Sequence, residues 1–346
     1  MADRKRSPFP FALLAIATLA VLALLVLPSS ASWAQGTPYP QTTLEPRSEV
    51  ARAIDDVLDG IVVWVIIIFV VVETALVFTV FRFRQRPGGA AARHMHGNTA
   101  LEIGWTLAPA IILAFIAVPT VKTIFANAEK KTGDITVRAI GHQWWWEFQY
   151  PGKGVITANE LHLPVGKTVN LELESVDVIH SFWIPAFAGK KDLVPGRTNH
   201  LWFTPEDTGT FPGQCAEFCG ASHANMYFKV VVQTPEEFDA WLAQQKAPVA
   251  PPDSASLAAR GLAIYQKGQC VACHMIDGVS YGVVGPNLGK VSTRQTIAAG
   301  MFPNDDEHLA AWIKNAPSLK PGSLMTKQDL SDEDVQALVA YLRTRR

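Results

Sequence analysis

Residues 215–226 read Cys-Ala-Glu-Phe-Cys-Gly-Ala-Ser-His-Ala-Asn-Met and place two thiols, an imidazole and a thioether on one short segment. A second imidazole, His180, stands upstream in the motif His-Ser-Phe-Trp. Soft sulfur donors combined with imidazole favour copper. A single blue-copper ion needs one Cys, two His and a weak axial Met, so this segment has one strong donor too many. Two copper ions that share both thiolates would use every donor.

Two other interpretations of this segment are weaker. A Cys₂His₂ zinc site would leave Met226 without a role. A disulfide between Cys215 and Cys219 would leave His180 and His223 without one.

The motif Cys-x₃-Cys-x₃-His-x₂-Met with an upstream His resembles the dinuclear copper A loop of cytochrome c oxidase subunit II. The resemblance implies a backbone donor, the carbonyl of Glu217. It also implies five side-chain ligands for two copper ions: His180, Cys215, Cys219, His223 and Met226.

In that family the matching Glu217 side chain contributes to a magnesium site at the interface with subunit I. A carboxylate suits a hard cation, but one carboxylate cannot hold Mg²⁺ alone, so this site depends on the partner subunit. Asp192 precedes a loop that also resembles the family, Val194-Pro195-Gly196-Arg197, and is expected to be a structural or interface residue.

The composition of the 346 residues points to a membrane-associated chain of several domains. Hydrophobic residues make up 49% of it, and the net charge of −1 gives no footprint for nucleic-acid binding. Its four cysteines form two close pairs, Cys215/Cys219 and Cys270/Cys273, a spacing typical of metal and haem chemistry rather than of a disulfide scaffold.

The first 34 residues have the features of a signal peptide, namely a basic start, an apolar run over 9–27 and small residues up to Ala34. Retention of this segment as an extra anchor is the alternative. Within 35–130, an N-terminal tail precedes two predicted transmembrane helices at about 60–81 and 103–125. Arginines follow the first of these helices, so the intervening loop is expected to be cytoplasmic. Everything after residue 130 then lies on the periplasmic, outer face of a bacterial plasma membrane. The arginines in question are Arg82, Arg84, Arg86 and Arg93.

Two carboxylates fall in or beside the predicted spans. Glu73 lies in mid-span and is expected to face a protein partner, because a lone carboxylate in lipid is costly. Glu102 opens the second span, where its charge suits a helix N-terminus. The family resemblance implies a second role for Glu102, at the mouth of a proton channel in subunit I.

Residues 131–246 alternate short β-rich runs with turn residues, which predicts an all-β, cupredoxin-like sandwich with the copper segments in its loops. The expected strands are 135–140, 168–174, 198–203 and 227–232. In the aromatic motif Trp144-Trp145-Trp146, the first residue matches the family's exposed tryptophan through which electrons enter. The family has Tyr where this chain has Trp145. Eight basic against thirteen acidic residues over 132–246 suit either a basic electron donor or ordinary solubility.

A Pro-rich linker at 247–255 separates this region from a predicted all-α, class I cytochrome c domain at 256–346. Cys270-Val271-Ala272-Cys273-His274 is the C-x-x-C-H attachment signature of haem c, with His274 as the proximal iron ligand. Met325 is the expected distal ligand, and a Met/His pair raises the haem potential. Met301 and His308 are the alternative distal ligands. Met275 is excluded, because it adjoins the proximal His274 and cannot reach the other face of the haem.

Over nearly its full length the chain resembles subunit II of a bacterial haem–copper oxidase with a fused cytochrome c domain. The resemblance implies one covalent haem c that accepts electrons from an external cytochrome c or another reductase. Those electrons would pass through two copper ions to subunit I, where oxygen is reduced and protons are translocated. Expected partners are subunits I and III and membrane lipid.

Two alternative functions remain. One is a quinol oxidase subunit that has lost its copper, and the other is a membrane-tethered carrier or redox sensor without subunit I. Nitrous-oxide reductase shares the copper loop but is a soluble enzyme, so the two predicted membrane spans exclude it.

Overall fold

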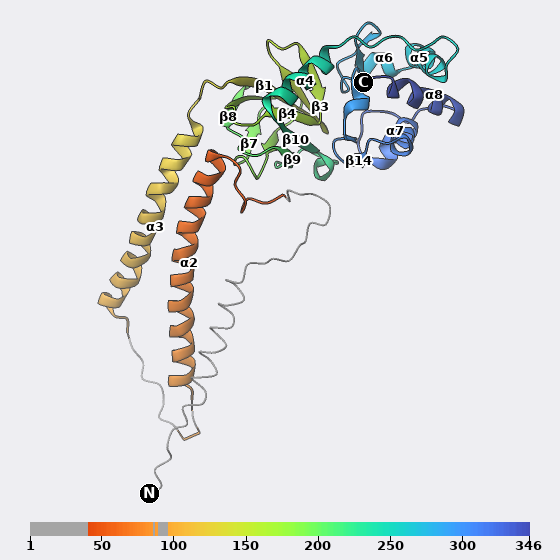
Figure 1. The fold of residues 1–346 in the computed structure, drawn as a ribbon. Coiled ribbons are helices and arrows are strands. Elements are labelled where there is room, and N and C mark those ends of the chain that lie inside the picture. Colours follow the sequence, from red (N-terminus) through yellow and green to blue (C-terminus); the bar gives the residue numbers. More distant parts are fainter. Residues whose placement is uncertain (1–40, 86, 89–95) are drawn as a thin grey trace. The chain divides into compact units, whose positions relative to one another are not determined.

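The computed structural model describes residues 41–85, 87–88 and 96–346. The predicted signal peptide, residues 1–34, lies outside the described residues, as do Arg86 and Arg93 of the predicted cytoplasmic loop. Two long helices, two five-stranded sheets and a set of shorter helices follow in chain order (Figure 1). This order confirms the expected fold class.

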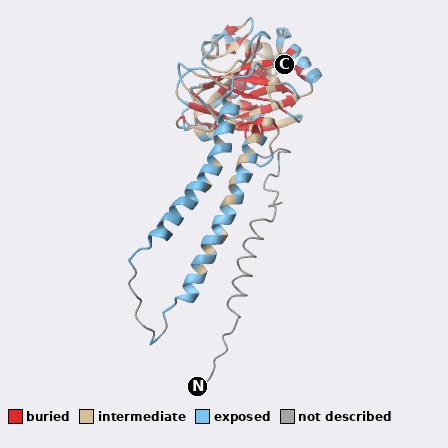
Figure 2. Cartoon of the chain, turned by 90° about the vertical axis from the view of Figure 1, so that its left-hand side faces the viewer, coloured by how far each residue is buried: buried red, intermediate tan, exposed pale blue. Residues whose placement is uncertain are grey.

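The two long helices are α2 (Glu49–Arg82) and α3 (Thr99–Ala128), and the predicted spans lie inside them. Both are long and apolar enough to cross a membrane, and the apolar window of each has no buried residue. Figure 2 shows the exposure along both helices. They contact each other, with Trp64 stacked on Phe115 at 6.3 Å between ring centroids. Apolar side chains left exposed along a whole helix suit contact with lipid or with apolar protein surfaces.

Helix α2 begins eleven residues before its predicted span because its first turn belongs to the sandwich. The Ser48 hydroxyl caps the helix by accepting from the backbone N–H of Ala51. Glu49 accepts from the backbone N–H of Thr204 at 3.1 Å and from its hydroxyl at 2.7 Å. Arg52 pairs with Glu206. These polar contacts fix the start of the helix against the end of β8 (Asn199–Phe203).

Two five-stranded sheets form the sandwich, in the orders β3-β2-β1-β5-β8 and β4-β10-β9-β6-β7. Only the β1–β5 and β4–β10 pairs are parallel. The first sheet comprises β1 (Ile135–His142), β2 (Trp145–Tyr150), β3 (Val155–Ala158), β5 (Val169–Ser175) and β8 (Asn199–Phe203). The second comprises β4 (Glu160–Pro164), β6 (His180–Trp183), β7 (Lys191–Leu193), β9 (Gly209–Cys215) and β10 (Tyr227–Gln233).

The core of the sandwich is aromatic. Alternation along β2 buries Trp146, Phe148 and Tyr150 and turns Trp145 to the opposite face. Trp146 packs edge-on against Phe182 of the other sheet, with ring centroids 5.3 Å apart. Helix α4 (Pro235–Lys246), which starts with a capping box, then covers one end of the sandwich. One of the three consecutive tryptophans is therefore a core residue, and the other two remain available for a site.

The last region contains helices α5 (Leu257–Lys267), α6 (Cys270–Cys273), α7 (Asp306–Leu319) and α8 (Asp332–Arg343). Helix α7 is kinked at Asn315. Helices α5 and α8 cross so closely that a Cβ on Gly261 would lie 1.9 Å from the carbonyl oxygen of Ala337. Glycine is therefore needed at this crossing. Short elements complete the fold: η1 (His223–Asn225), η2 (Val291–Thr293), β11 (Met275–Ile276), β12 (Ser280–Tyr281), β13 (Thr296–Ile297) and β14 (Phe302–Pro303).

Candidate metal centres

The copper-loop residues come together at one end of the second sheet. His180 begins β6, Cys215 ends the neighbouring strand β9, and Met226 directly precedes β10. The turn between β9 and β10 carries Cys219 and, in η1, His223. Strand pairing thus brings together ligands that are far apart in the sequence.

The donor atoms of these residues surround one small volume. Cys215 Sγ lies 3.7 Å from Cys219 Sγ, 3.9 Å from His180 Nδ1 and 3.3 Å from the carbonyl oxygen of Glu217. Cys219 Sγ lies 3.5 Å from His223 Nδ1 and 3.8 Å from Met226 Sδ. Six donor atoms therefore lie close together. Each of the two thiol sulfur atoms is within 4 Å of the other and of two further donors.

The distances between these donor atoms argue against both a disulfide and a zinc site in the loop. A separation of 3.7 Å between the sulfur atoms is far longer than the roughly 2.0 Å of a disulfide bond, so the thiols are not bonded. A tetrahedral zinc ion takes four ligands. The Met226 thioether and the Glu217 carbonyl both lie within 4 Å of a cysteine sulfur, so this structure offers more donors than such an ion uses. A set of thiols, imidazoles and a thioether fits copper.

The electrostatics of the loop favour bound cations. A hydrogen bond from the Cys219 thiol lowers the pKa of Cys215 to about 3 and raises the pKa of Cys219. One thiolate therefore forms readily, and a second beside it is unfavourable unless positive charge lies between the two sulfur atoms. His180, Cys215, Cys219 and Met226 are all buried, which keeps the thiols from water.

Asp177 holds His180 in place, and sequence reasoning did not single it out. Its carboxylate accepts from His180 Nε2 at 2.8 Å and from the backbone N–H groups of Gln143 and Val178, both at 2.6 Å. His180 therefore turns Nδ1 toward Cys215. Gly141 makes room for the ring, since a Cβ there would lie 2.7 Å from His180 Cδ2. An Asp three residues before the His is the only local signal of this role.

Trp144 lies against the copper loop. Its indole Nε1 donates to the carbonyl oxygen of Cys219 at 3.0 Å. Trp145 instead stacks on His142 with ring centroids 4.0 Å apart. Of the two, Trp144 makes the direct contact with a predicted ligand residue.

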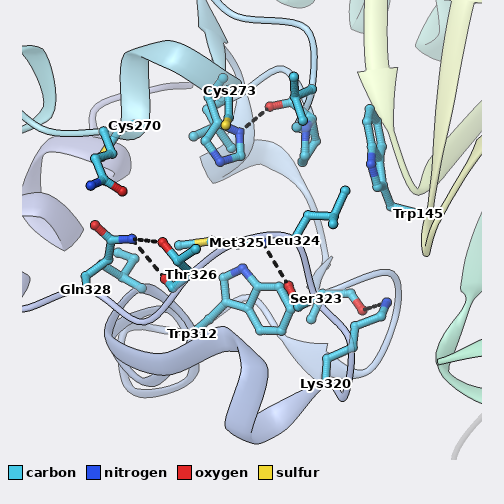
Figure 3. A pocket seen from close by; sticks show the side chains of 18 of the residues that line it. Trp145, Cys270, Cys273, Trp312, Lys320, Ser323, Leu324, Met325, Thr326 and Gln328 are labelled. Atoms are coloured by element: carbon cyan, nitrogen blue, oxygen red, sulfur yellow. Dashed lines mark hydrogen bonds between the residues drawn. The ribbon is translucent and has the colours of Figure 1, made fainter. Parts of the chain in front are cut away.

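The haem-motif residues line a cavity of about 270 Å³, and Trp144 and Trp145 of the sandwich line it too. Figure 3 shows Cys273 on one side of it and Met325 with Trp312 on the other. Apolar side chains such as Leu338 and Leu342 line much of the remainder. Such a cavity suits a flat apolar ring system bound through thiols on one wall.

His274 is held as a proximal ligand would be. Its Nδ1 donates to the carbonyl oxygen of Pro286 at 2.8 Å, which leaves Nε2 for a metal ion. Burial lowers the pKa of His274, so the neutral imidazole that can bind iron is favoured. Gly285 permits this packing, because a Cβ there would lie 2.6 Å from His274 Cε1.

The structure places Met325 in the wall of this cavity. The alternative ligands lie elsewhere among the described residues. His308 is exposed in part and pairs with Asp305 at 2.8 Å, and neither it nor Met301 is among the residues that line the cavity. Met275 accepts a hydrogen bond from Asn287.

The side chains of Glu102, Glu217 and Asp192 are not among the donors of either centre, although the backbone carbonyl of Glu217 is. Glu102 is exposed at the start of α3, and the helix from there to Ala128 extends about 40 Å at 1.5 Å per residue. The Glu217 carboxylate lies 3.6 Å from Lys190 Nζ. Asp192 is exposed on β7, and its backbone carbonyl accepts from Asn199.

Comparisons with known proteins cover most of the chain. Family models match for the transmembrane domain of cytochrome c oxidase subunit II over residues 38–123, its periplasmic domain over 152–234, and cytochrome c over 258–346. A protein of Alkalihalophilus pseudofirmus named cytochrome c oxidase subunit 2 is 40% identical over 311 residues, covering 88% of this chain and 90% of the relative. A Bacillus subtilis protein of the same name is 33% identical, covering 89% and 92%. A Bacillus cereus protein named quinol oxidase subunit 2 is 32% identical, covering 59% and 74%.

Proposed function

Because this chain belongs to the cytochrome c oxidase subunit II family and carries a cytochrome c domain, we propose that it is the electron-input subunit of a bacterial haem–copper oxidase. Electrons from an external cytochrome c or another reductase reach the haem domain, pass to the copper loop and continue to subunit I. Oxygen reduction and proton translocation take place in subunit I. The convergence of six copper-type donors beside a haem-type cavity in one chain is the observation that carries this proposal.

The proposed cofactors are two copper ions in the loop and one haem c attached to Cys270 and Cys273. When bound, they supply one-electron redox sites. The chain holds the copper ligands in a buried volume with little room to rearrange, which suits fast electron transfer because little reorganisation follows a change of charge. His274 and Met325 both line the haem cavity and are the residues that would hold its iron.

The proposed orientation follows from the charges at the ends of the long helices. Arg82 and Arg84 follow the apolar part of α2, which supports an orientation with that end in the cytoplasm of a bacterial cell and the two cofactor regions in the periplasm. Glu102 then lies at the cytoplasmic end, where a proton channel of subunit I would begin. Glu73 faces a partner helix of subunit I, and subunit III and a magnesium ion beside Glu217 complete the proposed assembly.

Both rival functions are disfavoured. A quinol oxidase subunit without copper has no use for six converging donors, although a protein of that name is among the relatives. A tethered carrier without subunit I has no use for Glu73 within a membrane span.

Metal analysis and EPR on the chain purified from membranes test the proposal. We expect a seven-line signal from one electron shared by two copper nuclei, and a large haem-containing subunit in the same preparation. We expect two copper ions per covalent haem in the chain once it is separated from that subunit. Zinc, or a single copper ion with a four-line signal, would refute the dinuclear assignment. Absence of any second haem-containing subunit would favour the tethered carrier.

A further inference from the structure

The loop that carries Met325 also packs on the copper loop. The Trp144 indole lies between two glycines, one from each loop. A Cβ on Gly220 of the copper loop would lie 3.0 Å from Trp144 Cζ2, and a Cβ on Gly322 of the Met325 loop would lie 2.6 Å from Trp144 Cη2. The Ser222 hydroxyl donates to the carbonyl oxygen of Pro321 in the same contact. The chain's own haem domain thus contacts Trp144, which is half-buried.

Lys320, in this contact, is 4% exposed, which is unusual for a lysine. Its Nζ donates to three backbone carbonyl oxygens: Trp144 at 2.7 Å, Asn225 at 2.8 Å and Ala298 at 3.0 Å. The first two belong to the copper domain and the third to the haem domain. An ammonium group has three N–H donors, and all three are used here. Burial lowers the pKa of this amine to about 7, and only the charged ammonium form can make all three of these hydrogen bonds.

A second buried ionisable side chain makes the reverse connection. Glu160, on β4 of the copper domain, is 2% exposed. Its Oε1 accepts from the backbone N–H of Gln295 at 2.6 Å and of Thr296 at 3.0 Å, both in the haem domain. A backbone hydrogen bond from Tyr227 N to Ala299 O, 3.1 Å long, also joins the two domains.

Two such anchors specify one docking position. A buried ionisable group is costly unless hydrogen bonds satisfy it, and each anchor has two backbone partners on the other domain. A shift or rotation of the haem domain would break both sets of hydrogen bonds together while leaving polar groups buried. A domain that swings freely on the 247–255 linker would have no need for either anchor.

We propose that Lys320 and Glu160 lock the haem domain in a single docked position on the copper loop, with Trp144 enclosed between the two domains. One consequence rests on the proposed function: Trp144 receives electrons from this chain's own haem domain, and an external donor must deliver its electron to the haem domain. Lys320 and Glu160 are positioning residues, since neither lies among the proposed ligands.

A protease site introduced into the linker at residues 250–253 of the full chain, within its membrane complex, tests the lock. After cleavage, size-exclusion chromatography measures how much haem domain remains with the copper domain. We expect the wild-type fragments to elute together. Lys320→Met and Glu160→Gln should weaken the association of the fragments at least tenfold. Lys327→Met, an exposed lysine of the same loop, is the matched control and should behave as wild type.

Haem and copper absorption spectra taken before cleavage show whether both domains of each variant are folded. If Lys320→Met disturbs the haem spectrum, the retention measured for Glu160→Gln, whose substitution lies in the copper domain, tests the proposal instead. In uncleaved Lys320→Met, reduction of copper by the haem should be slower while reduction of the haem by an external donor is unchanged. Dissociation of the wild-type fragments, or full retention in both variants, would overturn the proposal. Retention is measured without reference to copper content, so failure of the dinuclear assignment would leave this result readable.

Discussion

Substitution of Asp177 by Asn is the most direct test of how the chain positions its copper ligands. In the structure one carboxylate oxygen accepts from His180 Nε2 and from Val178 N, and the other accepts from Gln143 N. An amide has only one acceptor oxygen. In one orientation its NH₂ group would face Gln143 N–H, and in the other it would face the His180 ring and Val178 N–H. Every orientation therefore replaces at least one hydrogen bond by a contact between two donors.

The magnitude follows from these bonds. Loss of one hydrogen bond to a charged group costs about 1.5–3 kcal/mol. Changes to residues that orient a metal ligand typically weaken metal affinity about 10–100-fold, which is consistent with that range. We expect Asp177→Asn to bind copper about 10–100-fold more weakly than wild type, as measured by competition with a chelator of known affinity. Asp192→Asn, an exposed carboxylate of the same domain, is the control.

An unchanged copper affinity in Asp177→Asn would refute the inference that this carboxylate fixes the His180 ring. An equal loss in Asp192→Asn would attribute the effect to domain charge instead. Circular dichroism of both metal-free variants separates these outcomes from misfolding.

Four further outcomes are expected. Met325→Ala should keep its covalent haem but lose the iron–sulfur absorption band and fall in redox potential, whereas His308→Ala should retain both, as spectroelectrochemistry would show. Cys219→Ser should hold at most one copper ion and lose the delocalised EPR signal, and two retained ions would contradict the bridging role of this thiolate. Gly261→Ala should destabilise the haem domain by about 1–3 kcal/mol through overpacking against Ala337, and an unchanged thermal unfolding of that domain would show that the α5–α8 crossing can relax. Burial raises the pKa of Asp177, but its hydrogen bonds with His180 and with backbone N–H groups outweigh this and lower the pKa below its ordinary value. Asp177 therefore stabilises the metal-free domain above about pH 4, and this contribution is lost as the pH falls through its folded pKa; acid titration of Asp177→Asn should lack this step.

Much of the architecture followed from local patterns. Uninterrupted apolar runs predicted α2 and α3, and β-branched runs predicted β1, β5, β8 and β10. Strands β6 and β9 were not predicted. Strand β9 contains Gly209, Pro212 and Gly213, which argue locally against a strand, and it is held by pairing with β6 and β10. The kinked helix α7 was also not foreseen, because Pro317 lies inside it.

The proposed ligands were identifiable because thiols, imidazoles and thioethers at short spacing have few other uses, so chemistry alone indicated copper and haem. Their positioning groups were not identifiable. Asp177 is an ordinary loop carboxylate until its oxygens meet the backbone N–H groups of Gln143 and Val178.

By itself, the sequence determined the order of the domains, the kind of metal chemistry and the position of the membrane spans, because each depends on residues close together in the chain. The tertiary structure alone decided which side chains enclose Trp144. Lys320 lies 176 positions from Trp144 and 95 from Asn225. Only the packing of one domain on the other gives its amine three carbonyl acceptors, and no local pattern records a contact made across that distance.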